Sequence, residues 1–328
     1  STWKLFIVPL SPLPLTSTPA SRQLGIGILL MFIAAVTTVG NLLVLGALAW
    51  SREVLQGVTF SFIGSLAFAD LIMGALVMPA GAAYILGGSW RLGELMCLLW
   101  NSVDVLSTTA SIDTLCVIAM DRYVAITDPL RYQMHLTPKR ARFLIAFVWF
   151  IAAMISFFPI LMGWWRSDDP AACYADPDCC EYVSGKLYTA ISSVIVFYMP
   201  LSIMVFVYSR VLKEAERQVS VLNSSQCLPS CCRSLPERRA LKTLSLVMGV
   251  FIACWLPFFI CYAIQIFCMT CVPGPLFLFL IWLSDTNSTF NPFLYSRSPE
   301  FMSAYKRILC CNSDEKHHGV GAPPRGRG

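Results

Sequence analysis

The sequence predicts an all-α membrane protein: a bundle of seven transmembrane helices with a short amphipathic eighth helix. Hydrophobic residues make up 56% of the chain and charged residues 13%, with a mean hydropathy of +0.65. Seven apolar runs are long enough to cross a bilayer, and basic residues cluster in the segments between them. This composition excludes a soluble enzyme held by a single membrane anchor.

We expect four parts along the chain. Residues 1–23 form an outer tail, because the stretch is rich in proline and lacks the charged start and small-residue cleavage site of a signal peptide. Residues 24–297 hold the seven spans, residues 298–311 the eighth helix, and residues 312–328 a disordered cytoplasmic tail.

The spans are predicted from apolar stretches of bilayer length. Their expected bounds are Leu24–Trp50, Val58–Leu86, Glu94–Ile126, Arg142–Trp164, Leu187–Leu212, Ala240–Phe267 and Pro275–Tyr295. Prolines interrupt five of them, at Pro79, Pro159, Pro200, Pro257 and Pro292. Membrane helices tolerate such prolines where neighbours satisfy the freed carbonyl groups, so each one predicts a kink.

Basic residues indicate how the chain is oriented. Lysine and arginine gather in the loops on one side, as at Lys139, Arg140 and Arg210, whereas loops on the other side carry more acids. By the positive-inside rule the N-terminus is therefore extracellular. Because the bases are spread over short loops rather than one face, they do not indicate nucleic-acid binding.

The third predicted span carries charges at both ends. Asp104 and Arg122 lie five helical turns apart on one face, roughly 27 Å along the axis and close to one bilayer core. An ionisable residue inside a span costs about 2.5 to 3.5 kcal/mol on insertion and marks function by default. We expect a cation from outside to pair with Asp104, the alternative being pairing with neighbouring helices. For Asp113 we expect pairing with neighbouring helices.

Cysteines divide by compartment. Cys97, Cys173, Cys179 and Cys180 lie outside, where disulfides persist. One bridge from the third span to the second outer loop, and another within that loop, would account for all four. Cys268 and Cys271 flank the third outer loop, at a spacing that would close a small ring.

The stretch Pro299–Leu309 predicts a helix on the inner leaflet. Phe301, Tyr305 and Leu309 recur at helical spacing, and basic residues stand beside them. Cys310 and Cys311 follow directly and are palmitoylation candidates.

Enzymatic chemistry finds no support in the sequence. All three histidines fall in cytoplasmic segments, so no Ser-His-Asp or Cys-His constellation can form in the membrane or outside. No glycine-rich phosphate loop precedes a helix. A transporter, the competing class, would show internal repeats or matched glycine breaks, and we find neither.

Motifs in all seven spans resemble rhodopsin-like (class A) G-protein-coupled receptors. They are Asn41, Leu66-Ala-Phe-Ala-Asp70, Asp121-Arg122-Tyr123, Trp149, Pro200 with Tyr208, Phe251-x-x-Cys-Trp255-x-Pro257, and Asn291-Pro292-x-x-Tyr295. Trp100-x-Ser-Val-Asp104-Val105 resembles the aminergic receptors. Four further runs, Ala110–Cys116, Ile155–Trp165, Cys173–Cys180 and Ser298-Pro299-Glu300-Phe301, are similar to the beta-adrenergic receptors (beta-1/beta-3-like) in particular.

The resemblance implies an amine pocket. Asp104 would hold the protonated amine of adrenaline or noradrenaline, and Ser192 and Ser193 would bond the catechol hydroxyls. Other pocket residues would surround the ligand: Trp100, Val105, Tyr182, Val196, Trp255, Phe258, Phe259, Tyr262, Ile281 and Asp285. No organic cofactor is expected, but Asp70, Ser111, Asn287, Ser288 and Asn291 resemble an allosteric sodium site.

The same resemblance implies partners and a switch. The receptor would act at the plasma membrane on the stimulatory G protein and adenylate cyclase, with arrestin and a receptor kinase as further partners. Arg122 would be locked between Asp121 and Glu237, a pair of small energy if exposed. The remaining switch residues would be Tyr123, Pro200, Tyr208, Phe251, Pro292 and Tyr295.

Four pocket positions depart from the beta-adrenergic pattern, namely Val196, Tyr262, Ile281 and Asp285. A second carboxylate near Asp104 suggests that the preferred ligand has changed, toward a trace amine or a diamine. In the alternative, Asp285 turns to local polar groups such as Trp282 or Ser284 and affinity is merely weaker. A receptor that signals constitutively, or not at all, is the remaining alternative.

Overall fold

The computed structural model describes residues 20–50, 57–128, 132, 136–167, 178–180, 184–224, 234–268, 271–297 and 299–309. Side chains at 20–23, 215–216, 218–224, 234–244, 299–300, 307 and 309 lie outside the description. Most of the predicted outer tail, the cytoplasmic tail, Tyr182, Cys173, and the palmitoylation candidates Cys310 and Cys311 therefore fall outside the described residues, as does the Glu237 side chain.

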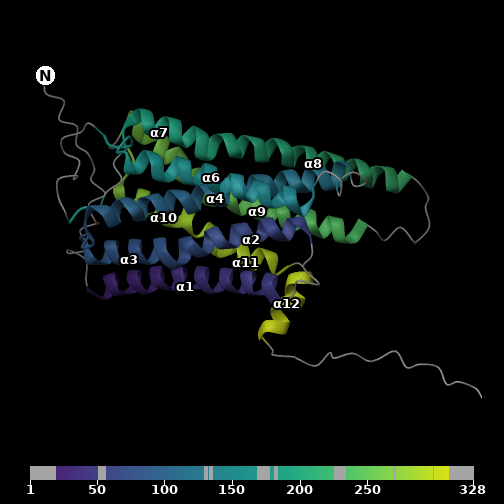
Figure 1. Ribbon diagram of the computed structural model, residues 1–328, viewed down its shortest axis with the longest axis horizontal. Helices are drawn as coiled ribbons and strands as arrows, with labels where there is room; N and C mark the ends of the chain where they lie inside the picture. The colour runs from purple at the N-terminus through teal and green to yellow at the C-terminus, as the bar shows by residue number, and fades with distance from the viewer. Residues whose placement is uncertain are drawn as a thin grey trace, which may run out of the picture.

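The described residues form an all-α bundle, as predicted, with long helices side by side (Figure 1). The first four spans are α1 (Ala20–Trp50), α2 with α3, α4 (Gly93–Thr127) and α6 (Pro138–Leu161). The fifth is α7 with α8, and the sixth is α9 (Ser234–Phe267). The α4 helix lies centrally, against α2, α6 and α8. Within the described ranges, six helices are long and apolar enough to cross a membrane.

The seventh span is not one continuous helix, which corrects the expected run Pro275–Tyr295. It consists of α10 (Gly274–Asp285) and α11 (Asn287–Tyr295), separated at Thr286. The Thr286 hydroxyl donates to the Leu283 carbonyl at 2.6 Å, and Pro292 has no N–H to give to the turn before it. The side chain of Asn41 in α1 bonds the Ser288 carbonyl instead, at 3.0 Å.

Two other spans change their winding just before a proline. The second is α2 (Val58–Ile72), a π-helical segment η2 (Met73–Val77), and α3 (Met78–Gly87). The fifth is α7 (Lys186–Ser193), a π-helical segment η4 (Val194–Tyr198), and α8 (Met199–Ser224). Pro79 and Pro200 follow these segments, so a wider turn takes the place of a simple kink.

Helix ends differ from the expected bounds where local capping decides them. The fourth span begins at Pro138 rather than Arg142, because Thr137 caps it by accepting a hydrogen bond from the Arg140 N–H. It ends at Leu161, three residues before the expected end, since Gly163 takes a left-handed turn with φ of 72°. The fifth and sixth helices also extend further toward their mutual loop than expected.

The eighth helix, α12 (Pro299–Leu309), turns away from the bundle near the end of α1 (Figure 1). Phe301 is buried, and its ring lies 5.7 Å from those of Tyr295 and Phe60. The predicted apolar face of this helix thus anchors it against the end of the seventh span.

Disulfides lie at the end of the bundle that the sequence predicts to be outside. Cys97 at the top of α4 is joined to Cys180, and Cys268 is joined to Cys271. Cys179 is also disulfide-bonded, and its expected partner Cys173 lies beyond the described part of the chain. The bridge from the third span to the second outer loop is therefore confirmed, as is the small ring.

Candidate functional site

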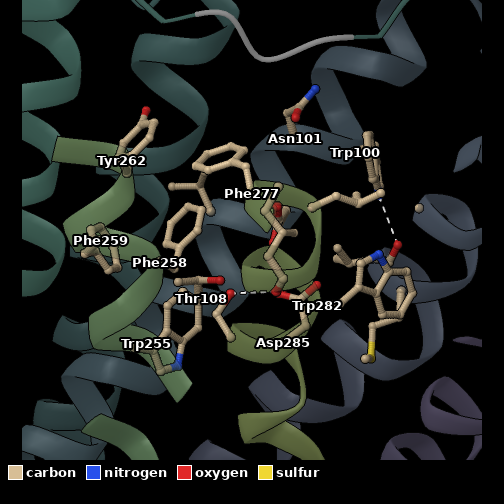
Figure 2. Close-up of a pocket in the computed structure, with 18 of the residues that line it drawn as sticks. Trp100, Asn101, Thr108, Trp255, Phe258, Phe259, Tyr262, Phe277, Trp282 and Asp285 are labelled. Carbon is tan, nitrogen blue, oxygen red and sulfur yellow. Dashed lines mark hydrogen bonds between the residues drawn. The ribbon is translucent and has the colours of Figure 1, made fainter. Parts of the chain in front are cut away.

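A cavity of about 500 Å³ opens among α3, α4, α7, α9 and α10. All the pocket residues expected from sequence line it, apart from Tyr182, which the structure does not describe. Figure 2 shows Trp255, Phe258, Phe259 and Tyr262 along α9, and Asp285 at the bottom of the view.

Asp104 reaches the cavity from the middle of α4. Its side chain is half-buried, and its carboxylate forms no ion pair with any described residue. The Asp104 backbone carbonyl, as distinct from the carboxylate, accepts a hydrogen bond from the Ser107 hydroxyl at 3.0 Å. The carboxylate is therefore open to a ligand, and pairing with neighbouring helices is not observed.

Asp285 enters the same cavity from the last residue of α10. The expected local partners do not bind it: Ser284 donates to the Ile281 carbonyl at 2.7 Å, and Trp282 makes no hydrogen bond with Asp285 in the described structure. Asp285 interacts electrostatically with Asp104 instead. Two carboxylates thus face one space, and none of the residues lining it is Lys, Arg or His.

The two serines on α7 differ in their bonding. Ser192 donates to the Thr189 carbonyl at 3.2 Å, within its own helix. Ser193 is 3% exposed, and its hydroxyl has no partner among the described groups. A buried hydroxyl without a partner costs free energy, so Ser193 is poised for a polar group on a ligand.

Aromatic rings from α9 and α10 form one wall. Phe258 stacks on Tyr262 at 5.6 Å between ring centroids and lies 5.5 Å from Phe277. The Tyr262 hydroxyl bonds Ser184 of the outer loop at 2.7 Å, so its polar end is already satisfied. Trp255 is buried beneath, 6.0 Å from the ring of Phe259. This wall suits the flat face of an aromatic ligand.

The opposite wall was not predicted beyond Trp100. It includes Trp282, Gly81 and Tyr84, and Trp100 is fixed there by donating its Nε1–H to the Val77 carbonyl at 3.1 Å. The spacing of Thr108, one turn after Asp104, could have identified that residue as another lining group. The η2 segment, which brings Val77 and Met78 to the cavity, had no recognisable sequence signal besides Pro79.

Asp113, on the same helix as Asp104, does not lie in the cavity. The expectation that neighbouring helices satisfy it is wrong, because it has no hydrogen bond or ion pair in the described ranges. Asp113 is half-buried within the span, and an unpaired carboxylate at that depth is costly where it faces lipid.

A polar cluster lies deeper in the bundle, around the buried Asp70. Its carboxylate accepts hydrogen bonds from Ser111 at 2.9 Å, Ser288 at 2.8 Å and Asn291 at 2.7 Å. Asn287, expected in the same set, is buried but makes no hydrogen bond to Asp70. The nearby Asn41 Oδ1 is buried without a partner among the described atoms. Carboxylate, hydroxyl and amide oxygens of this kind suit a hard cation.

The inner end of α4 holds a second network. Arg122 pairs with Asp121 at 2.6 Å and also donates to Thr59 and to Tyr132. Tyr132 donates in turn to Asp121 at 2.7 Å, and burial, together with this bond, raises the pKa of Tyr132. The condition for a small energy is not met, because this pair is largely buried: the Asp121 side chain is 0% exposed and that of Arg122 26%.

Other switch positions from the sequence lie along the inner halves of the helices. Tyr208 on α8 and Ser245 on α9 share a hydrogen bond between their hydroxyl groups. Phe251 and Pro292 are buried, and the buried Tyr295 hydroxyl has no partner among the described residues. Tyr123 is half-buried against the core, and Pro200 directly follows the first residue of α8.

Comparisons with known proteins agree with this arrangement. Residues 40–295 match the family described as 7 transmembrane receptor (rhodopsin family). The chain is 34% identical over 329 residues to a D(1)-like dopamine receptor of Takifugu rubripes, covering 89% of this chain and 72% of that one. It is 38% identical over 320 residues to 5-hydroxytryptamine receptor 4 of Homo sapiens, covering 88% and 81%.

A third relative is octopamine receptor beta-2R of Chilo suppressalis, 35% identical over 312 residues, with 86% of this chain and 78% of that one covered. These relatives are receptors rather than enzymes, and their names refer to different amines. The chain belongs to the rhodopsin family of seven-transmembrane receptors and, within it, to the G-protein-coupled receptors for biogenic amines.

Proposed function

We propose that the chain binds an aryl-alkyl amine at the plasma membrane and activates the stimulatory G protein and adenylate cyclase. The observation that carries the proposal is the open Asp104 carboxylate in a cavity whose other polar end is the unpartnered Ser193 hydroxyl. A protonated amine on Asp104 and a polar ring substituent on Ser193 would satisfy both groups.

The ring of the ligand would pack between the aromatic side chains of α9, above Trp255. Adrenaline and noradrenaline are the first candidates, because of the beta-adrenergic resemblance of the third and fourth spans. Dopamine, serotonin and octopamine are the next candidates, because relatives named for these amines share about a third of their residues with this chain. The N-terminus would lie outside, and arrestin and a receptor kinase would act on the inner face.

Cyclic AMP accumulation in cells expressing the chain tests the proposal. Each of the five amines is titrated against the native chain and against the Asp104→Ala variant. Truncating one partner of a buried charged pair costs about 2 to 5 kcal/mol, so potency should fall at least about 30-fold. A response that survives Asp104→Ala unchanged would refute the assignment of the amine site.

We also propose that the Asp70 cluster takes a sodium ion. Its support is the set of oxygen donors around a buried carboxylate, with Ser111 and Ser288 already in contact. The ion would favour the packing in which α2, α4 and α11 stay together, and so the inactive state.

A further inference from the structure

Two carboxylates share the amine end of the cavity. Asp104 comes from α4 and Asp285 from the end of α10, and each is half-buried with its carboxylate open to the space. The charge of Asp104 acts electrostatically on Asp285, and neither carboxylate forms an ion pair with a described residue. Within a low-dielectric pocket like charges repel, so either one of the two groups is protonated or, where both are ionised, each carboxylate requires its own compensation.

The protein does not supply that compensation. No lysine, arginine or histidine is among the residues that line the cavity. The two hydroxyls next to Asp285 in sequence are used locally, that of Ser284 by the Ile281 carbonyl and that of Thr286 by the Leu283 carbonyl. One ammonium group from a ligand would neutralise only one of the two carboxylates.

An independent feature indicates that a ligand occupies this space. Ser193 lines the same cavity from α7, is 3% exposed, and keeps its hydroxyl without a partner among the described groups. Buried hydroxyls in proteins normally have a hydrogen-bond partner, so we expect a ligand to supply the one that Ser193 lacks. The cavity therefore has two separate places that would bind polar groups of a ligand. Ser193 would bind a ring substituent, and the carboxylates of Asp104 and Asp285 would bind cations.

The place of Asp285 decides where a second cation would sit. In Figure 2 it lies between the α9 aromatic side chains and Trp282. A ligand with its ring on the α9 side and one nitrogen on Asp104 could direct a short chain toward Asp285 without leaving the cavity.

We propose that Asp104 and Asp285 together select a dibasic aryl-alkyl amine, a ligand with two protonated nitrogens at its amine end. The inference rests on the proposed function, because it adds a second cation to the amine that Asp104 binds. Asp285 is the residue that would give this receptor its preference over an ordinary monoamine.

The test uses two probes of nearly equal shape. In N-(3-aminopropyl)tyramine the chain ends in an amine, and in N-butyltyramine a methyl group takes its place. Both keep the ring hydroxyl for Ser193 and the first nitrogen for Asp104. The dissociation constant of each is measured by calorimetric titration of the full chain purified in detergent.

We expect the native chain to bind the diamine at least tenfold more tightly than N-butyltyramine. In Asp285→Asn the ratio should fall to within twofold of one, and saturable binding of N-butyltyramine to this variant, at whatever affinity, shows that it folds. Asp285→Tyr, a second variant without the charge, should behave in the same way. Asp104→Asn should weaken both probes.

Asp113→Asn is the matched control. It removes one carboxylate from the same transmembrane bundle but outside the cavity, so the native ratio should persist. A ratio that falls equally in Asp113→Asn would show a general effect of net charge and overturn the proposal. So would a native ratio near one, or a ratio that persists in both Asp285 variants.

Failure of the inference and failure of the proposed function give different results. In one case the native chain binds N-butyltyramine, Asp104→Asn abolishes that binding, and the diamine is not preferred. This result would support the amine site at Asp104 and refute the role of Asp285. A native chain that binds neither probe overturns both.

Discussion

Asn41 in the first span donates its side-chain amide to the Ser288 carbonyl in the seventh, at 3.0 Å. Pro292 stands four residues after Ser288, where a helix would normally return an N–H to that carbonyl. Asn41 thus replaces the backbone donor that the proline lacks, and the break at Thr286 is held against α1.

Removal of this bond should destabilise the bundle. Asn41→Ala leaves the Ser288 carbonyl without a partner, at a cost of about 1 to 3 kcal/mol. A lower midpoint of thermal unfolding for the purified chain would show the loss. Thr38→Ala is the control, since the Thr38 hydroxyl bonds only the Ala34 carbonyl of its own helix. Equal midpoints for the two variants would contradict the role of Asn41.

The close approach of α1 to η2 gives a second prediction. A Cβ on Gly74 would lie 2.8 Å from the Thr37 Cγ2 and 2.9 Å from the Thr38 backbone nitrogen. Gly74→Ala should force the helices apart and lower the unfolding midpoint, with a cost of about 1 to 3 kcal/mol typical of overpacking. Gly249→Ala, where no atom lies within 4 Å of the new Cβ, should leave the midpoint unchanged or raise it slightly.

The sodium proposal predicts an ion effect on agonist affinity. With 150 mM sodium in place of N-methylglucamine, on the order of physiological salt, agonist should bind the native chain several-fold more weakly, because sodium favours the inactive state. In Asp70→Asn, agonist should bind with the same affinity in sodium and in N-methylglucamine. In Asp113→Asn, agonist should still bind more weakly in sodium, as in the native chain. Retention of the sodium effect in Asp70→Asn would exclude this site.

Tyr132 gives a prediction about basal signalling. Tyr132→Phe removes the hydroxyl that donates to Asp121 at 2.7 Å and contacts Arg122 at 3.3 Å. If the network restrains the inactive state, losing about 1 kcal/mol of it should raise basal cyclic AMP about fivefold, where the active fraction is small. Thr127→Val, which removes only a bond to the carbonyl of Tyr123, should not raise it. Basal cyclic AMP that stays flat in Tyr132→Phe would place the restraint elsewhere.

Local chemistry made much of the fold predictable. Apolar length identified the spans, and the residues expected around Asp104 share one cavity where the structure describes them, because helical spacing determines which side chains share a face. The break at Thr286 and the bond from Asn41 were not predictable, since both depend on which carbonyl of another helix lies opposite. The burial of Asp121 was missed for a similar reason: Thr59 and Tyr132, from other segments, cover it.

The two π-helical segments also have a consequence for how the cavity tolerates changes in chain length. Each acts as a single extra residue within an otherwise regular helix, and one residue turns an α-helix by about 100°. If η4 wound as a regular α-helix with no residue removed, the part of the fifth span before it would rotate by about 100° relative to the part after it, whereas deleting one residue from η4 would leave the two parts in register. In the first case Ser193 would leave the wall of the cavity while every side chain remained in the sequence. The polar lining of this receptor is fixed by a count of residues as much as by their identities.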